Sequence, residues 1–341
     1  MRAAGAGIGA FYSPVGVGTP LAEGKETQEI DGRVHVLEYP IRGDVALIAA
    51  HRADTMGNLV YRKTARNFGP VMATAATTVV AQVTDIVPAG DRPGDRGHPR
   101  HPRRPPGTGR GPQAHRARSP LMTTTVPERT DRGPLTTDEL AARIARDIPA
   151  GSYVNLGIGQ PTRIAEHLSP DAGIVLHTEN GMLGMGPAAT ADEVDTDLTN
   201  AGKVPVTELP GAAYFHHADS FAMMRGGHLD VCVLGAFQVS QHGDLANWHT
   251  GDPDAIPAVG GAMDLAVGAR QVLVMMGLFA RDGAPKLVPA CTYPLTGPGC
   301  VHRVYTDHGV FAVGPDGVRV LETYGITVAE LERRLSVELR T

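Results

Sequence analysis

Short apolar runs with the length of a buried β-strand occur in two separate parts of the chain. Asp44–Ile48 opens such a run in the first part, and Asp230–Leu234 opens one in the second. Each run is followed, at the same offset, by a glycine, a polar residue and a leucine, in Gly57–Leu59 and in Gly243–Leu245. Gly-Asn and Gly-Asp pairs between strands are typical of hairpin turns. The pattern therefore predicts a strand followed by a hairpin in both parts.

A second pair of apolar runs, Thr77–Val83 and Gln271–Met276, follows the two hairpins. Two copies of one architecture in tandem is the economical explanation of this similarity. Chance similarity between strand-turn-strand units is the alternative, and the pattern by itself leaves both interpretations open.

The second part of the chain gives a more detailed prediction. Thr136–Glu139 has the Ser/Thr-x-x-Glu pattern of a helix capping box, and apolar residues at helical spacing follow it. We therefore expect a helix over 137–147, then a strand at Tyr153–Leu156 and another at Ile174–Leu176. Between these strands, Pro161 is well placed as the first residue of a second helix. This succession predicts an α/β fold with a largely parallel sheet.

The bulk composition is that of a soluble globular protein. Of the 341 residues, 42% are hydrophobic and 20% are charged, and the net charge is −5. This charge gives no general attraction to nucleic acid or to an anionic membrane, and no apolar run reaches the roughly 20 residues of a transmembrane helix. Cys232, Cys291 and Cys300 are too few and too widely spaced for a disulfide framework or a zinc site. We expect a cytoplasmic protein with reduced thiols and with neither nucleic-acid nor membrane partners.

One stretch departs sharply from this composition. Between Asp91 and Pro120, Arg, Pro, Gly and His dominate and apolar residues are almost absent. Such a segment cannot bury enough surface to offset its ordering entropy, so we predict a disordered linker over 91–121. A basic tract that binds an acidic partner is a second interpretation. A third is coding sequence read in the wrong frame, with Met122 as an independent start.

The predicted strand through Leu176 runs directly into a carboxylate. Glu179 follows it and precedes Asn180-Gly181, a pair that turns the chain sharply. A carboxylate just beyond the carboxyl end of a sheet strand lies where α/β proteins bind their ligands. For a glutamate before Asn-Gly taken alone, an exposed turn residue is the plain alternative.

The stretch Leu176–Gly184 reads Leu-His-Thr-Glu-Asn-Gly-Met-Leu-Gly and resembles the active-site sequence of the B subunit of 3-oxoacid CoA-transferases. Thr178 is a departure, since the family usually has serine there. The resemblance covers essentially all of 122–341 and implies one complete domain of the CoA-transferase fold, with largely parallel sheets flanked by helices. It continues through further blocks in order: Asn200–Lys203, Leu209–Ala212, Asp219–His228, Gly243–Trp248 and Gly260–Leu265.

The first part of the chain looks like the C-terminal part of the family's A subunit. Phe11–Thr19 and Thr64–Phe68 carry this similarity, which implies a partial, related α/β domain over 1–90. In the family, the A subunit has in addition an N-terminal half with a Gly-Gly-Phe-Gly loop that helps to stabilise the oxyanion, and this sequence contains no equivalent. Because loss of an oxyanion donor costs on the order of a hundredfold in rate, we expect the chain alone to be weakly active or inactive. An intact A subunit is one expected partner, and we expect an oligomer.

The resemblance assigns the covalent chemistry to Glu179. Its carboxylate attacks the thioester carbonyl of an acyl-CoA, and the resulting anhydride gives a glutamyl-CoA thioester with release of the first acid. A 3-oxoacid reverses the sequence and leaves as its CoA ester, which is nucleophilic catalysis with ping-pong kinetics. No permanently bound cofactor is implied, because coenzyme A is both a substrate and a transient covalent adduct. We expect Glu179→Asp to be severely impaired, because aspartate has a shorter reach, and Glu179→Ala to be inactive.

Other positions carry over from the family one by one. Asn155 is expected beside the reacting carbonyl, with an amide that satisfies the end of a strand as the alternative. Lys203 is expected near the CoA pyrophosphate, a suitable position for an ammonium, and is otherwise a solvated surface lysine. Gly260, Gly261 and Ala262 are expected to form a wall of small residues that admits the thioester close to the backbone, and are otherwise a simple turn.

The blocks Tyr214–Asp219, Asn247–Gly251 and Pro253–Val259 look more like 3-oxoadipate CoA-transferases than acetoacetate ones. The resemblance implies succinyl-CoA as the donor and 3-oxoadipate as the acceptor, in the breakdown of aromatic compounds by the β-ketoadipate route. The alternatives are acetoacetate as the acceptor, hydrolysis, and a non-catalytic remnant or structural partner. Because cationic or donor groups favour a second carboxylate, three histidines are expected to help accommodate it: His216, His217 and His249. His216, His217 and Asp219 together could suggest a metal site, but the sequence places no other ligand nearby, so we expect no metal.

Overall fold

The computed structural model describes residues 1–88, 128–129, 133–251, 254 and 259–341. The predicted linker over 91–121, the candidate start Met122 and most of the block Pro253–Val259 lie outside the described residues. In the described part of the chain, no helix has the length and apolar composition needed to cross a bilayer.

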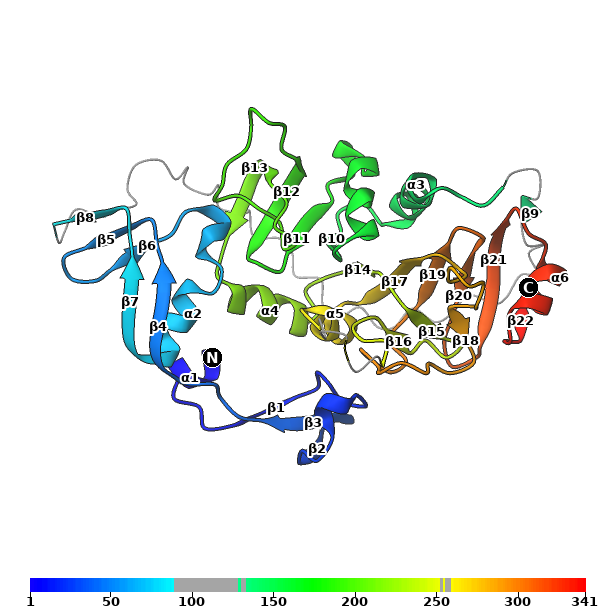
Figure 1. Ribbon diagram of the computed structural model, residues 1–341, viewed down its shortest axis with the longest axis horizontal. Helices are drawn as coiled ribbons and strands as arrows, with labels where there is room; N and C mark the ends of the chain where they lie inside the picture. Colours follow the sequence, from blue (N-terminus) through cyan, green and yellow to red (C-terminus); the bar gives the residue numbers. More distant parts are fainter. Residues whose placement is uncertain (89–127, 130–132, 252–253, 255–258) are drawn as a thin grey trace, which may run out of the picture.

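The second part of the chain is organised around one mixed sheet (Figure 1). Within the described residues, its strands follow the order β13-β12-β11-β10-β14-β17-β19-β20-β21-β22, and β9 pairs with β21. The central strands run parallel: β11 (Val175–Thr178), β10 (Tyr153–Leu156), β14 (Val231–Leu234), β17 (Gln271–Met276) and β19 (Arg303–Thr306). The outer strands are β12 (Met182–Ala188), β13 (Val206–Tyr214), β20 (Gly309–Ala312), β21 (Val318–Tyr324), β22 (Leu339–Arg340) and β9 (Glu128–Arg129).

The parallel strands are apolar at successive positions because both faces of the sheet are covered. On β14, Val231 and Val233 belong to one hydrophobic core, whereas Cys232 and Leu234 belong to the other. The first core takes side chains from α3 (Thr137–Asp147) and from the 3-10 helix η3 (Gln160–His167). The second takes them from α4 (His217–Arg225), α5 (Ala262–Gly268) and α6 (Val328–Arg334). The result is a three-layer α/β arrangement, as the sequence predicts.

Local signals placed several of these elements correctly. The predicted helix over 137–147 is α3, and Thr136 and Glu139 form the predicted capping box at its start. The strand at Tyr153–Leu156 is also confirmed. The second predicted helix is instead the 3-10 helix η3, which begins at Gln160. Over so short a segment the apolar spacing does not separate 3.0 from 3.6 residues per turn.

The first part of the chain repeats the element order of the second on a smaller scale, and both predicted hairpins are confirmed. A parallel pair, β4 (Gly43–Ala49) with β7 (Ala76–Gln82), corresponds to β14 with β17. A hairpin, β5 (Arg52–Asp54) with β6 (Leu59–Val60), corresponds to β15 (Gln238–Ser240) with β16 (Leu245–Ala246). A further parallel pairing, β5 with β8 (Asp85–Val87), corresponds to β15 with β18 (Leu287–Val288). The domain boundaries at 90 and 122 stay a prediction.

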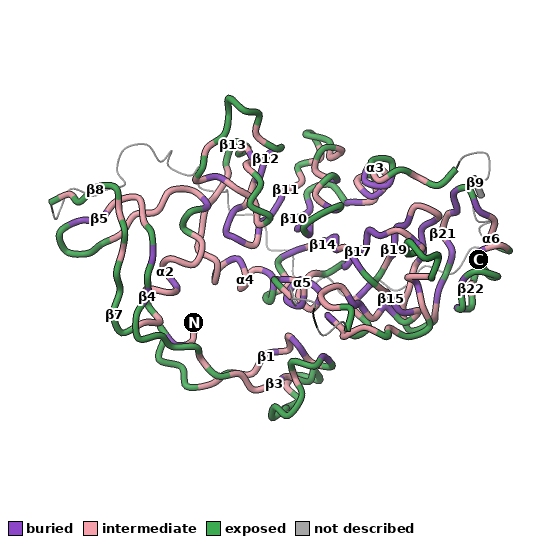
Figure 2. The backbone as a smooth tube through the Cα atoms, viewed as in Figure 1, coloured by how far each residue is buried: buried purple, intermediate pink, exposed green. Residues whose placement is uncertain are grey.

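The small sheet of β4 and β7 differs from the main sheet in its exposure. Val45 and Leu47 on β4 are 57% and 71% exposed, and Val80 on β7 is 54% exposed. Figure 2 draws β7 as exposed over most of its length, whereas β14 and β17 are buried. One face of this parallel pair packs against α2 (Gly69–Ala75) and buries Ala46 and Ile48. In the described part of the chain, the other face lacks the covering layer that parallel sheets normally have.

Contacts at several places join the first part of the chain to the second, among them the stacking of Phe68 on His217 and a hydrogen bond from Arg33 to the carbonyl of Val267. Around η2 (Lys63–Arg66), the guanidinium of Arg62 lies 2.9 Å from Asp195 and 2.5 Å from Asp197, and Thr64 Oγ1 donates to the carbonyl of Asp197 at 2.8 Å. Near the N-terminus, Thr19 and Pro20 lie across a cavity from the loop at Thr292–Leu295.

The remaining elements are α1 (Arg2–Gly5), η1 (Pro20–Ala22), α2 (Gly69–Ala75), η4 (Pro170–Ala172), β1 (Phe11–Ser13), β2 (Thr27–Ile30) and β3 (Arg33–Glu38).

Candidate active site

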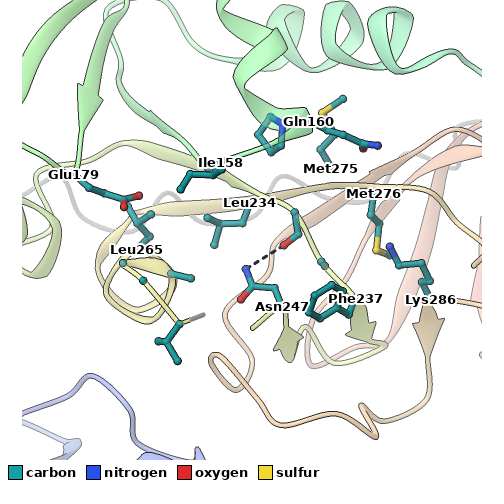
Figure 3. Close-up of a pocket in the computed structure, with 18 of the residues that line it drawn as sticks. Ile158, Gln160, Glu179, Leu234, Phe237, Asn247, Leu265, Met275, Met276 and Lys286 are labelled. Atoms are coloured by element: carbon teal, nitrogen blue, oxygen red, sulfur yellow. Dashed lines mark hydrogen bonds between the residues drawn. The ribbon is translucent and has the colours of Figure 1, made fainter. Parts of the chain in front are cut away.

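A cavity of about 440 Å³ lies at the carboxyl ends of the parallel strands (Figure 3). Four residues that directly follow these strands line it: Gly157 after β10, Glu179 after β11, Gly235 after β14 and Gly277 after β17. Ligands of α/β proteins bind at this edge of the sheet. The cavity also takes in the following residues: Ile158, Gln160, Pro161, Leu234, Ala236, Phe237, Asn247, Val259, Gly260, Gly261, Ala262, Leu265, Met275, Met276 and Lys286.

A tight turn carries Glu179 from β11 to the antiparallel strand β12. The N–H of Gly181 donates to the carbonyl of Thr178 at 3.1 Å, and the side chain of Asn180 donates to Thr199 O at 2.8 Å. Gly181 has φ +109°, and a Cβ there would lie 2.1 Å from the carbonyl oxygen of Phe215. The Asn-Gly pair is therefore required by the close packing of this turn, which leaves the Glu179 side chain in the cavity.

The surroundings of Glu179 favour its protonated form. Burial raises the pKa of its carboxyl group, and the negative charge of Asp264 raises that pKa further. Asp264 lies on α5, is 7% exposed and forms an ion pair with Arg225 at 2.5 Å. Burial also raises the pKa of Asp264, against the opposing effect of Arg225. A carboxylate with a raised pKa is more basic than an ordinary one once it is ionised.

The three small residues expected to form a wall all line this cavity. A Cβ at Gly261 would lie 3.1 Å from Cδ and 3.2 Å from Oε2 of Glu179, so a side chain there would press on the carboxylate. Gly260 has φ +53°, which also favours glycine. Ala262 is the first residue of α5. The geometry brings Gly260, Gly261 and Ala262 together with Glu179, while their part in thioester binding stays a prediction.

Asn155 does not line the cavity that holds Glu179, and its side chain contacts His177 instead. The side chain is buried on β10, and its Nδ2 lies 3.2 Å from His177 Nδ1 and 3.3 Å from the His177 carbonyl. His177 Nε2 lies 2.9 Å from Ser220 Oγ, and that hydroxyl donates to the carbonyl of Thr178 at 3.1 Å. Burial lowers the pKa of His177 to about 4, so the imidazole is neutral at pH 7. The chain Asn155–His177–Ser220 thus ends on the residue that precedes Glu179.

The remaining predicted residues do not line the cavity in the described part of the chain. Lys203 is exposed in a turn. His216 caps α4 and lies 3.2 Å from Asp219, and His249 accepts from the N–H of Gly251. His217 stacks between Phe68 and Phe221, and burial lowers its pKa to about 4. A neutral His217 does not supply the cationic charge expected for a second carboxylate, whereas its ring N–H is still a donor.

Three residues at or beside the cavity have no signal in the sequence that points to them: Ser220, Asp264 and Lys286. Ser220 and Asp264 stand inside blocks that carry the family resemblance, yet no local pattern pairs them with Glu179. Lys286 precedes a two-residue strand and has no local signal at all. Among the described residues, no three His, Cys, Asp or Glu side chains are grouped so that they could hold a metal ion.

Comparison with known proteins gives a consistent family. The sequence profile of the coenzyme A transferase family matches residues 1–100 and 137–323. The B subunit of 3-oxoadipate CoA-transferase from Pseudomonas putida is 60% identical over 206 residues, which cover 60% of this chain and 96% of that protein. The human mitochondrial succinyl-CoA:3-ketoacid coenzyme A transferase 2 is 40% identical over 337 residues, with 92% of this chain matched to 64% of that protein.

A solved structure supports the same fold. The apoenzyme of the acyl-CoA transferase YdiF from Escherichia coli O157:H7 superposes with a TM-score of 0.70 at 20% sequence identity, over all of this chain and 73% of that one. The CoA-transferase-like α/β fold expected from the sequence is confirmed. The chain belongs to the coenzyme A transferase family and is an enzyme of the CoA-transferase class.

Proposed function

We propose that the chain transfers CoA from succinyl-CoA to 3-oxoadipate through a glutamyl-CoA thioester on Glu179. One observation carries this proposal. Glu179 is the only carboxylate that the described residues contribute to the lining of the cavity at the carboxyl edge of the parallel strands. Its carboxylate packs against Gly261, where a hypothetical Cβ would lie 3.1 Å from Cδ of Glu179. Coenzyme A then serves as a substrate and as a transient covalent adduct, with no permanently bound cofactor.

The proposed reaction is balanced without any other reagent. An oxygen of Glu179 forms a bond to the thioester carbonyl carbon of succinyl-CoA, and the carbon–sulfur bond breaks to release CoA thiolate. The thiolate attacks Cδ of Glu179, and the anhydride bond breaks to release succinate. The carboxylate of 3-oxoadipate attacks the glutamyl thioester, and the same steps in reverse restore Glu179. The neighbouring backbone at Gly260 and Gly261 is the proposed wall for the thioester during both halves.

The choice of acid rests on the relatives. The bacterial relatives that match the second part of the chain at 58–60% identity are named as the B subunit of 3-oxoadipate CoA-transferase. The human relative, at 40% identity, is named for a 3-ketoacid. Acetoacetate is therefore the alternative acceptor. We keep as the alternative of another class a chain that binds a partner polypeptide without catalysing transfer.

We propose that the partner is a polypeptide like the A subunit of this family, bound over the sheet of β4 and β7. The exposed Val45, Leu47 and Val80 offer an apolar face, and a parallel sheet is normally covered on both sides. The bacterial relatives are named as a B subunit, a name that implies a further polypeptide. This partner would supply the oxyanion donors for which the sequence has no equivalent.

The experiment is intact mass spectrometry of the purified chain after incubation with succinyl-CoA. We expect the wild-type chain, alone or with an A subunit, to gain the mass of CoA less one water. The adduct should be discharged by 3-oxoadipate and should not form on Glu179→Ala. Glu166→Ala, which removes an exposed carboxylate from η3, is the matched control and should still form it.

The outcomes separate the alternatives. An adduct that acetoacetate discharges faster than 3-oxoadipate would reverse the order of the two acceptors. Absence of an adduct both with and without an A subunit would favour the non-catalytic alternative and contradict the assignment of Glu179.

A further inference from the structure

Phe68, in the first part of the chain, makes a direct ring contact with the second part. It stands immediately before α2, and its ring stacks on the imidazole of His217 with ring centroids 3.7 Å apart and planes at 24°. The N–H of His217 donates to the carbonyl of Asn67 at 2.9 Å, so a backbone and a side-chain contact meet at one residue. His217 is the first residue of α4. The first part of the chain therefore holds the start of α4 at two points.

The stack continues along one face of α4. His217, Phe221 and Arg225 follow one another at intervals of about one helical turn, so their side chains lie on the same face. The rings of His217 and Phe221 stack with centroids 4.2 Å apart, and the guanidinium carbon of Arg225 lies 5.5 Å from the centroid of Phe221. Arg225 in turn pairs with Asp264 on α5. A row of side chains that begins at Phe68 thus runs from α2 to α5 (Figure 1).

The middle of this row touches the wall of the cavity. A Cβ at Gly261 would lie 3.3 Å from Cζ of Phe221 and 3.1 Å from Cδ of Glu179, so the ring and the carboxylate both lie against the same side of Gly261. Phe221 packs against a hydrophobic core, and α4 packs on α5. Because a close-packed interior transmits a displacement instead of absorbing it, the position of the Phe221 ring affects the space around Glu179.

We propose that Phe68 is a positioning residue for Glu179, acting through the stacked rings of His217 and Phe221 on the wall at Gly261. The inference rests on the proposed function and deepens it, because it gives the first part of the chain a role in the covalent step. Phe68 does not line the cavity, so it acts on the site only through these neighbours. His217, whose imidazole is neutral at pH 7, serves as a flat spacer between two phenyl rings.

The experiment is quenched-flow mass spectrometry of CoA-adduct formation as a function of succinyl-CoA concentration. It uses the full chain, alone or with an A subunit, under the conditions in which the wild-type chain forms the adduct. Phe68→Leu keeps an apolar side chain but removes the ring. Its maximal rate should fall by about tenfold to a hundredfold, because a small displacement of the reacting groups is costly. Its half-saturating concentration should change by less than about twofold, because substrate binding is not altered. Phe68→Tyr keeps the ring and should recover most of the rate.

A double variant tests whether the effect passes through the stack. Phe221→Leu should also slow adduct formation. Phe68→Leu added to Phe221→Leu should cause no further loss, because both changes interrupt the same row of contacts. Phe11→Leu removes a ring that is 39% exposed on β1, in the first part of the chain, and is the matched control. It should form the adduct at the wild-type rate.

Each other result contradicts the proposal. A wild-type rate in Phe68→Leu would show that the stack does not reach Glu179, and an equal loss in Phe68→Tyr would show that the ring is not what matters. Additive losses in the double variant would mean independent effects. A higher half-saturating concentration at an unchanged maximal rate would assign Phe68 to substrate binding.

Two further measurements keep the test decisive. Thermal melting distinguishes a folded Phe68→Leu variant from an unfolded one, and His217→Gln, which removes the middle ring, repeats the test if Phe68→Leu does not fold. If the wild-type chain forms the adduct while these losses are absent, only the role of Phe68 fails. If the wild-type chain forms no adduct with or without an A subunit, the proposed function fails and the role of Phe68 fails with it.

Discussion

At the residue scale, the chemistry depends on what surrounds one carboxylate. Burial and the charge of Asp264 both raise the pKa of Glu179. Gly261 approaches so closely that an added methyl group would lie 3.1 Å from Cδ of that side chain. The site thus combines a more basic carboxylate with a glycine packed directly against it. The same burial reduces the ionised fraction when the pH falls, and only the ionised form attacks a thioester.

The pH dependence of adduct formation tests this environment. Because the pKa of Glu179 is raised, the rate of CoA-adduct formation should begin to fall at a higher pH than it would for an ordinary glutamate. Asp264→Asn removes the neighbouring negative charge, so the midpoint of the pH profile should move to lower pH. Quenched-flow mass spectrometry of both chains between about pH 4 and about pH 8 measures the midpoints, spanning the ordinary carboxylate range.

An exposed aspartate provides the control. Asp171→Asn in η4 removes the same charge away from the cavity and should leave the midpoint unchanged. A midpoint that is unchanged or moves upward in Asp264→Asn would contradict the account of the Glu179 environment.

At the element scale, the position of the nucleophile depends on how β10, β11 and α4 are tied together. Asn155 comes from β10, His177 from β11 and Ser220 from α4, and one chain of hydrogen bonds connects them. Ser220 is fully buried, so neither of its partners can turn to water instead. Parallel strands and a helix from distant parts of the sequence therefore hold the Thr178 carbonyl in place, directly before Glu179.

Removal of the Ser220 hydroxyl tests that connection. Ser220→Ala should lower the free energy of unfolding by about 1–3 kcal/mol, because it leaves a buried imidazole nitrogen and a buried carbonyl without their hydrogen-bond partner. CoA-adduct formation should slow as well, since the Thr178–Glu179 peptide loses a fixed point. Urea denaturation and adduct kinetics measure the two effects. Ser169→Ala, at an exposed serine whose side chain makes no capping bond, is the control. Unchanged stability in Ser220→Ala would show that the chain of hydrogen bonds has no structural role.

At the scale of the whole molecule, two parts of the chain with the same element order meet through an ionic contact. Arg62 pairs with Asp195 and Asp197, and Lys63 lies 3.2 Å from Asp195. Burial acts to raise the pKa of Asp195, but the backbone N–H of Asp197 and the cations Arg62 and Lys63 together lower it to about 2. Because the folded-state pKa of Asp195 lies below its unfolded value, its contribution to stability is present above the unfolded pKa and is lost as the pH falls toward 2.

Thermal melting as a function of pH checks this contribution. Asp195→Asn should lower the melting temperature most clearly above about pH 4, the ordinary range of an aspartate, and the difference from wild type should vanish as the pH approaches about 2. Asp192→Asn changes an exposed residue of the same loop and should behave as wild type. A difference that is constant with pH would mean that the charge of Asp195 does not hold the two parts together.

The sequence by itself determined the features that a few neighbouring residues encode. The capping box at Thr136 fixed the start of α3, the apolar run at Gln271–Met276 fixed β17, and Gly-Asn and Gly-Asp pairs fixed two hairpins. It also put Glu179 at the end of a strand and so at the ligand edge of a parallel sheet. These signals are local because capping, alternation and turn formation involve residues within one or two turns of each other.

Only the tertiary structure decided which side chains face that carboxylate. Asp264 comes from α5 and lies close enough to raise the pKa of Glu179, and Lys286, just before β18, lines the same cavity. Both are brought there because β14 and β17 continue the sheet from β10 and β11. The same packing leaves His216, His217 and His249 off the cavity lining, although the sequence resemblance predicted that they bind the second carboxylate of the substrate. Strand order and layer packing set these distances, and residues far apart in the chain carry no local pattern that records them.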